Sequence, residues 1–252
     1  MSQLQDETVL QYRHPPSNDD EAHEFRATQL LHRTQEVSAT IDLMLSDALS
    51  PSVWKQTSTH EPTDRGDLVT DPLSQFRGRI KKDFVAMAGH SFGAATGFLA
   101  AQKDHRIGSM LAFDPWMFPL PSNYNEKVQL RALPTLVINS STFHWPSNLQ
   151  SLAMLLQRNH ELGSLQSMQI TLNSTGHLDQ SDFSAIIPAW IRNRYRSGAT
   201  ADPVDVLTTN AQLNFAFLDR IFQRTPNSLN PYRDILWKDA KPSSKFTVDI
   251  KL

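Results

Sequence analysis

The chain contains no cysteine among its 252 residues. This absence excludes disulfide bonds, thiolate catalysis, iron–sulfur clusters and cysteine-ligated zinc sites. No apolar run reaches the ~18 residues that a membrane-spanning helix requires. The N-terminal segment also lacks the basic and apolar regions of a signal peptide. We therefore expect a cytoplasmic protein rather than a secreted one, with association at a membrane surface as an open alternative.

An excess of positive charge is also missing. Lys and Arg total 24 and Asp and Glu total 26, so the formal net charge is −2. Proteins that bind nucleic acid carry a basic surface, so we expect no nucleic-acid partner. The sequence has no H-E-x-x-H motif or other metal-ligand spacing, and we expect neither a metallohydrolase nor a metal site.

After residue 84 the sequence alternates short apolar runs with helical patterns. Such alternation predicts an α/β fold with a parallel sheet covered by helices on both faces. We expect strands at 84–88, 109–113, 133–139 and 168–172, and helices at 94–102, 148–158, 180–196 and 204–223. Before residue 84 the pattern predicts one long helix at 21–49 and a polar loop at 51–79. We expect three regions: a disordered lead at 1–20, a catalytic domain at 21–225 and a C-terminal loop tail at 226–252.

The motif that carries chemistry is Gly89-x-Ser91-x-Gly93, because a predicted strand precedes it and a predicted helix follows it. In this context a serine occupies a strained turn, and residues two before and two after it are expected to lack side chains. Ser91 is then the candidate nucleophile. The N–H of Phe92, at the start of the helix, is the candidate oxyanion donor. The alternative is a tight strand–helix turn without chemistry.

A serine nucleophile needs a base and a group that orients the base. In this architecture the acid and then the histidine follow later strands. Asp114 ends the second predicted strand and His177 follows the fourth, so we expect them to be the orienting acid and the base. The alternatives are a turn carboxylate at Asp114 and a solvated loop histidine at His177. If Asp114 is not the orienting acid, Asp179 and Asp182 are the next candidates for that role.

Two longer blocks resemble the platelet-activating-factor acetylhydrolase family, the group VII phospholipases A2. They are Gly-His-Ser-Phe-Gly-Ala-Ala-Thr at 89–96 and Phe-Asp-Pro-Trp-Met-Phe-Pro-Leu at 113–120, against family patterns GHSFGGAT and LDAWMFPL. Shorter similarities lie at 137–140, 176–183 and 214–218. The resemblance covers about residues 21–225.

This resemblance implies an α/β-hydrolase fold, with Ser91, Asp114 and His177 as the catalytic residues and no calcium or other cofactor. It also implies that Trp116 and Phe92 flank the pocket for a short sn-2 acyl group. The expected activity is hydrolysis of short or oxidised sn-2 acyl groups of phospholipids, the substrate lying at a membrane or lipoprotein surface.

Residues 1–83 differ from the family, because they show no strand–loop that would supply a second oxyanion donor. We therefore expect a sheet that is incomplete on its N-terminal side, with the strand before Ser91 at its edge. An exposed edge favours self-association. Two further functions stay open: a poorly active or non-catalytic derivative that acts by association, and a serine hydrolase for another ester.

Overall fold

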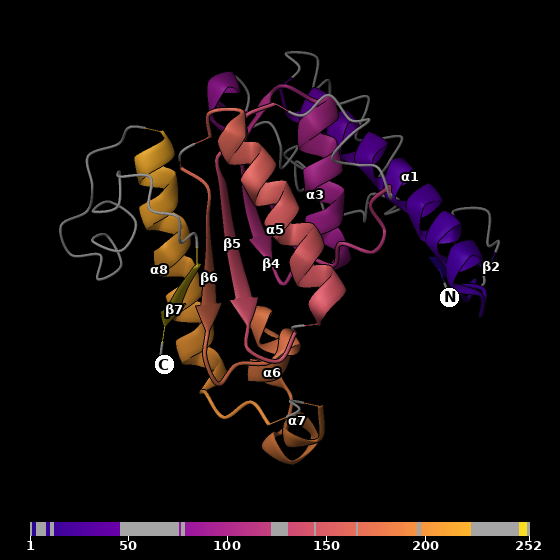
Figure 1. Cartoon of the computed structure of the whole chain (residues 1–252), viewed down its shortest axis with the longest axis vertical. Helices are drawn as coiled ribbons and strands as arrows, with labels where there is room; N and C mark the ends of the chain where they lie inside the picture. The colour runs from indigo at the N-terminus through magenta and orange to yellow at the C-terminus, as the bar shows by residue number, and fades with distance from the viewer. Residues whose placement is uncertain are drawn as a thin grey trace, which may run out of the picture. The chain divides into compact units, whose positions relative to one another are not determined.

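The computed structural model describes residues 2–3, 9–10, 13–45, 76, 79–121, 131–143, 145–164, 166–195, 198–222 and 247–250 (Figure 1). The chain divides into two compact units, residues 1–82 and residues 83–252. Across these described segments, no helix is long and apolar enough to cross a membrane.

The first unit holds one long helix, α1 (Asp19–Leu45). It begins two residues before the predicted start because Asn18 caps it. The Asn18 side-chain oxygen accepts hydrogen bonds from the backbone N–H groups of Asp20 at 2.9 Å and Glu21 at 3.2 Å. Two short strands, β1 (Ser2–Gln3) and β2 (Val9–Leu10), pair antiparallel where the sequence predicted a disordered lead. The predicted loop at 51–79 lies outside the described residues except at 76 and 79.

The second unit contains a parallel sheet in the order β3-β4-β5-β6-β7. Its strands are β3 (Val85–His90), β4 (Ile107–Phe113), β5 (Thr135–Ser140), β6 (Met168–Leu172) and β7 (Thr247–Ile250). The predicted α/β class and the four predicted strands are confirmed. Among the described strands β3 lies at the sheet edge, as the sequence predicted.

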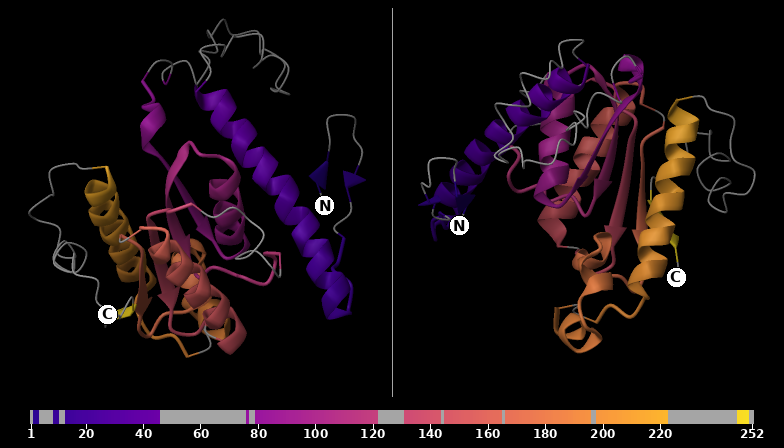
Figure 2. Two further views of the ribbon diagram at one scale, coloured as in Figure 1. Left: turned by 45° about the horizontal axis from the view of Figure 1, so that its top comes forward. Right: turned by 180° about the vertical axis from the view of Figure 1, so that it is seen from behind.

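Helices cover both faces of this sheet, with α3 and α5 on one face and α8 on the other (Figures 1 and 2). The helical segments are η2 (Lys82–Phe84), α3 (Phe92–Lys103), α5 (Pro146–Glu161), η3 (His177–Gln180), α6 (Phe183–Ile186), α7 (Ala189–Tyr195) and α8 (Pro203–Ile221). On the α8 face, Leu213 and Phe217 pack into a buried cluster with Leu136, Ile138 and Ile170. This packing is why the strands read as continuous apolar runs.

Two predictions of local structure are wrong. The single helix predicted at 180–196 is divided into η3, α6 and α7, and Pro188 separates the last two. Proline disfavours a helical conformation in the residue before it, and Ile187 is extended, with φ −80° and ψ 146°. The tail predicted as a loop contains β7, which pairs parallel with β6.

The sheet brings together the loops that matter for function. In its register His90 lies opposite Phe113, Phe113 opposite Ile138, and Ser140 opposite Leu172. Because the strands are parallel, their carboxyl ends lie at the same edge of the sheet. The loops after β3, β4, β5 and β6 therefore converge there, which is where open α/β sheets bind ligands.

Candidate active site

Ser91 occupies a strained turn between β3 and α3. Its backbone has φ 56° and ψ −118°, a conformation that side-chain-bearing residues rarely adopt. Hydrogen bonds hold it on two sides: the Ser91 N–H donates to the Phe113 carbonyl at 2.9 Å, and the Ser91 carbonyl accepts from the Trp116 N–H at 3.2 Å. The turn is thereby tied to the loop that carries Asp114. The predicted strand–serine–helix arrangement is present.

The two glycines of the motif are not equivalent. A Cβ on Gly89 would meet the carbonyl oxygen of Gly93 and lie 2.5 Å from its carbonyl carbon, far inside van der Waals contact. A Cβ on Gly93 would have nothing within 4 Å. The expectation that both positions must lack a side chain is therefore wrong at Gly93.

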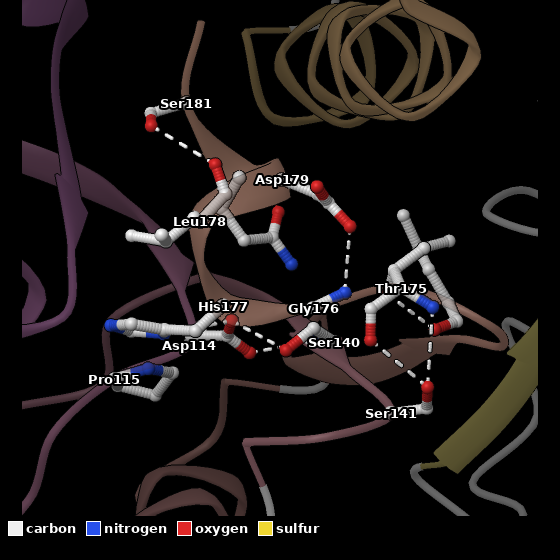
Figure 3. Close-up of polar contacts among 12 residues, drawn as sticks. Asp114, Pro115, Ser140, Ser141, Thr175, Gly176, His177, Leu178, Asp179 and Ser181 are labelled. Atoms are coloured by element: carbon white, nitrogen blue, oxygen red, sulfur yellow. Dashed lines mark hydrogen bonds and ion pairs between the residues drawn. The ribbon is translucent and has the colours of Figure 1, made fainter. Parts of the chain in front are cut away.

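Asp114 follows β4 and is completely buried. One carboxylate oxygen accepts the backbone N–H of Ser140 at 2.6 Å. The other accepts the Ser140 hydroxyl at 2.7 Å and lies 3.0 Å from Nδ1 of His177 (Figure 3). The Asp114 backbone is itself in the left-handed region, with φ 41°. Its carboxylate is thus fixed between the end of β5 and the His177 ring, rather than serving as a local turn cap.

His177 is the first residue of η3, and a hydrogen-bonded loop holds it in place (Figure 3). The buried carboxylate of Asp179 accepts the Gly176 N–H at 2.8 Å, and the Asp179 N–H donates to the Gly176 carbonyl at 2.9 Å. The Ser141 hydroxyl donates to the Thr175 carbonyl at 3.0 Å, which ties this loop to the end of β5. Asp179 therefore shapes the histidine loop, and it is Asp114 whose carboxylate contacts the ring of His177.

Two rings enclose His177. Phe143 stacks on it with centroids 3.8 Å apart and planes at 12°, and His90 lies at 4.3 Å, tilted by 39°. Burial is the main reason that the pKa of His90 falls from 6.5 to about 4, and the nearby His177 lowers it further. Asp114 and a hydrogen bond to the His177 backbone oppose this shift. His90 is therefore neutral at pH 7.

The two residues expected to flank a substrate pocket lie beside each other next to Ser91. The rings of Phe92 and Trp116 are 6.1 Å apart, and Trp116 stacks on Phe118 with centroids 5.7 Å apart and planes at 13°. Phe92 opens α3, where the helix dipole favours negative charge at the first backbone N–H groups.

The structure thus brings Asp114 and His177 into direct contact. Ser91 is linked to this pair in two ways: its neighbour His90 packs against the His177 ring, and its carbonyl accepts a hydrogen bond from Trp116 in the loop that carries Asp114. Within the described residues no hydrogen bond joins Ser91 Oγ to the His177 ring. The sequence did not predict that Ser140, Phe143 and His90 contact the Asp114–His177 pair. Ser140 carried a signal, since residues 137–140 belong to the blocks that resemble the family. His144, which follows Phe143 in the sequence, lies outside the described residues.

The parallel sheet, the strained serine turn and the helices on both faces define an α/β-hydrolase fold. A solved ferulic acid esterase from Streptomyces cinnamoneus has a similar fold, with a TM-score of 0.53 and 17% identity. The match covers 87% of this chain and 53% of that one.

Sequence comparison shows the family to which the chain belongs. The model of the family "Platelet-activating factor acetylhydrolase, isoform II" matches residues 2–230, and the chain belongs to this family. The platelet-activating factor acetylhydrolase of Bos taurus is 25% identical over 207 residues, which cover 80% of this chain and 41% of the relative. That of Canis lupus familiaris is 27% identical over 172 residues, covering 66% and 33%. The chain therefore spans less than half the length of these relatives.

Proposed function

We propose that this protein is a serine esterase that hydrolyses short or oxidised sn-2 acyl groups of phospholipids without a cofactor. The observation that carries the proposal is the contact between the buried Asp114 carboxylate and Nδ1 of His177, beside the strained turn of Ser91. The acyl and phospholipid specificity rests on the family and on the Phe92–Trp116 pair beside Ser91.

The residues would act in the following order. Asp114 holds the proton of His177 on Nδ1, which leaves the lone pair of Nε2 to accept the Ser91 hydroxyl proton. The Ser91 oxygen attacks the ester carbonyl, and the Phe92 N–H donates to the oxyanion that forms. The ester C–O bond then breaks, and His177 returns its proton to the departing lysophospholipid oxygen. Water, activated by His177, hydrolyses the acyl-serine and restores Ser91.

A substrate series tests this proposal. Phosphatidylcholines with an sn-2 acetyl or palmitoyl group are compared in the wild type, Ser91→Ala and the control Ser151→Ala, a helix-surface serine. We expect release of acetate by the wild type and the control, little release of palmitate, and background rates for Ser91→Ala. Equal rates on both chain lengths would contradict the substrate class, and unchanged activity in Ser91→Ala would contradict the nucleophile.

A second candidate is a non-catalytic derivative that acts by association. The observation that favours it is the position of β3 at the edge of the described sheet, because an unpaired strand edge can recruit another strand. A folded wild-type protein that hydrolyses no ester and forms a stable dimer would support this candidate over the first.

The substrate surface is a further part of the proposal. After His177, the short helices α6 and α7 expose Ile186 by 73% and Trp190 by 78%. Large exposed apolar side chains of this kind suit the surface of a phospholipid bilayer. We expect Trp190→Ala to reduce sedimentation with phosphatidylcholine vesicles while leaving hydrolysis of a water-soluble acetyl ester unchanged. Met154→Ala, which removes an apolar side chain 52% exposed on α5, is the matched control; equal vesicle binding by both variants would contradict this surface.

A further inference from the structure

Beyond hydrolysis, we infer that the cluster of His90, Asp114 and His177 is an inhibitory binding site for Zn²⁺. Its effect on turnover rests on the proposed function, whereas zinc binding itself does not. The cation would be a regulator that competes with catalysis, not a cofactor.

The geometry of the three side chains supports such a site. Each offers one ligand atom, and the three atoms lie within 4.8 Å of one another. Nδ1 of His177 and an Asp114 carboxylate oxygen are only 3.0 Å apart. A bound zinc ion has ligands at about 2.0–2.2 Å, so small side-chain rotations bring all three within reach.

The donor types are those that zinc prefers. Two imidazoles and one carboxylate make a recurrent three-ligand zinc set with one position left for water. Nε2 of His90 is buried and has no hydrogen-bond partner among the described residues. Such an atom favours a ligand because burial has removed it from water without giving it a partner. The His177 side chain is 27% exposed, so a cation can reach the cluster from solvent.

Zinc bound there would stop His177 from transferring protons. Nδ1 of His177 is the atom beside Asp114, so the ion would displace the proton there, and the neutral ring would carry its single proton on Nε2 instead. Nε2 could then no longer accept the proton of Ser91. Mg²⁺ and Ca²⁺ prefer oxygen ligands, so we expect neither ion to inhibit.

Sequence spacing does not reveal this cluster, because its ligands follow three different strands. His90 ends β3, Asp114 follows β4 and His177 follows β6. Only the parallel pairing of β3 through β6 places them at one edge of the sheet.

The experiment uses the full chain and ZnCl₂ as the only added ligand. Zinc binding is measured by equilibrium dialysis for the wild type, His90→Gln, His90→Asn and the control His105→Gln, which alters an exposed turn histidine. Circular dichroism and urea unfolding establish that each variant is folded. Losing a partner outside the ligand shell already costs about 10–100-fold in metal affinity, so we expect loss of the His90 ligand to weaken zinc binding at least tenfold.

Fluorophosphonate labelling in parallel separates the site from the catalytic proposal. We expect Zn²⁺ to slow wild-type and His105→Gln labelling, EDTA to restore it, and the His90 variants to be labelled at their own basal rates with or without zinc. Equal zinc affinity in all variants, or wild-type labelling that ignores zinc, would overturn the inference. Zinc binding that requires His90, in a wild-type protein that fluorophosphonate does not label even in EDTA, would support the zinc site and contradict the proposed esterase.

Discussion

Gly89 and Gly93 give a matched pair of substitutions with opposite expected results. In Gly89→Ala the new methyl group would lie 2.5 Å from the Gly93 carbonyl carbon and 2.6 Å from the Ala94 nitrogen. Carbon atoms prefer separations of about 3.5–4.0 Å, so the backbone on one side of Ser91 must move by about 1 Å. Overpacking of this kind costs about 1–3 kcal/mol of stability, and a misplacement of about 1 Å can cost about 100-fold in rate.

Gly93→Ala should lower neither the stability nor the rate, because its methyl group has nothing within 4 Å. Alanine is favoured over glycine within a helix such as α3, by about 0.5–1 kcal/mol. Urea unfolding and the rate of fluorophosphonate labelling measure both effects. We expect lower stability and about 100-fold slower labelling for Gly89→Ala, and equal or higher stability with near-wild-type labelling for Gly93→Ala. Two variants that behave alike would refute the argument.

Four further substitutions test the surroundings of the base. Asp114→Asn should cut turnover by about 10⁴ with little change in KM, because the tautomer of His177 is no longer fixed. Ser140→Ala removes one charge-assisted hydrogen bond to the Asp114 carboxylate and should lower turnover only about tenfold. A larger loss of turnover in Ser140→Ala than in Asp114→Asn would contradict this order. Phe143→Leu should lower kcat about two- to tenfold with KM unchanged, since it removes the stacked ring; a change in KM alone would instead indicate substrate contact. Because the pKa of His90 is lowered from 6.5 to about 4, His90 is protonated in the unfolded chain but not in the folded chain between these pH values. The free energy of unfolding therefore has its full His90 contribution above pH 6.5 and loses it as the pH falls toward about 4. Urea unfolding in EDTA at pH 7.5 and 5.0 should therefore show a smaller pH-dependent loss for His90→Gln than for the wild type, and equal losses would contradict a buried neutral His90.

The strands β4 and β5 were predictable because they are buried along most of their length and are therefore apolar. The apolar runs that became β4 and β6 needed no knowledge of tertiary structure to be recognised. Strand β7 (Thr247–Ile250) was not predicted, because a four-residue edge strand with alternating polar residues has a weaker sequence pattern than a buried strand. At Pro188 the local rule was available and predicts the observed break.

The contact between Asp114 and His177 was predictable, because the place of each residue after a strand of the parallel sheet is a property of chain order. The side chains that hold these two residues in place were not predictable. The Ser140 hydroxyl and the Phe143 ring reach Asp114 and His177 through rotamers that sequence spacing does not specify. The different demands on Gly89 and Gly93 likewise depend on which backbone atoms approach each Cα, and a pattern of two glycines treats them as equal.

Catalysis at this site requires that Ser91 is an activated nucleophile. Labelling the wild-type protein with a fluorophosphonate, digesting it and locating the adduct by mass spectrometry tests this most directly. We expect one adduct on the peptide containing Ser91, lost in Ser91→Ala and strongly reduced in Asp114→Asn. An adduct on another serine, or a folded wild-type protein that carries none, would contradict it.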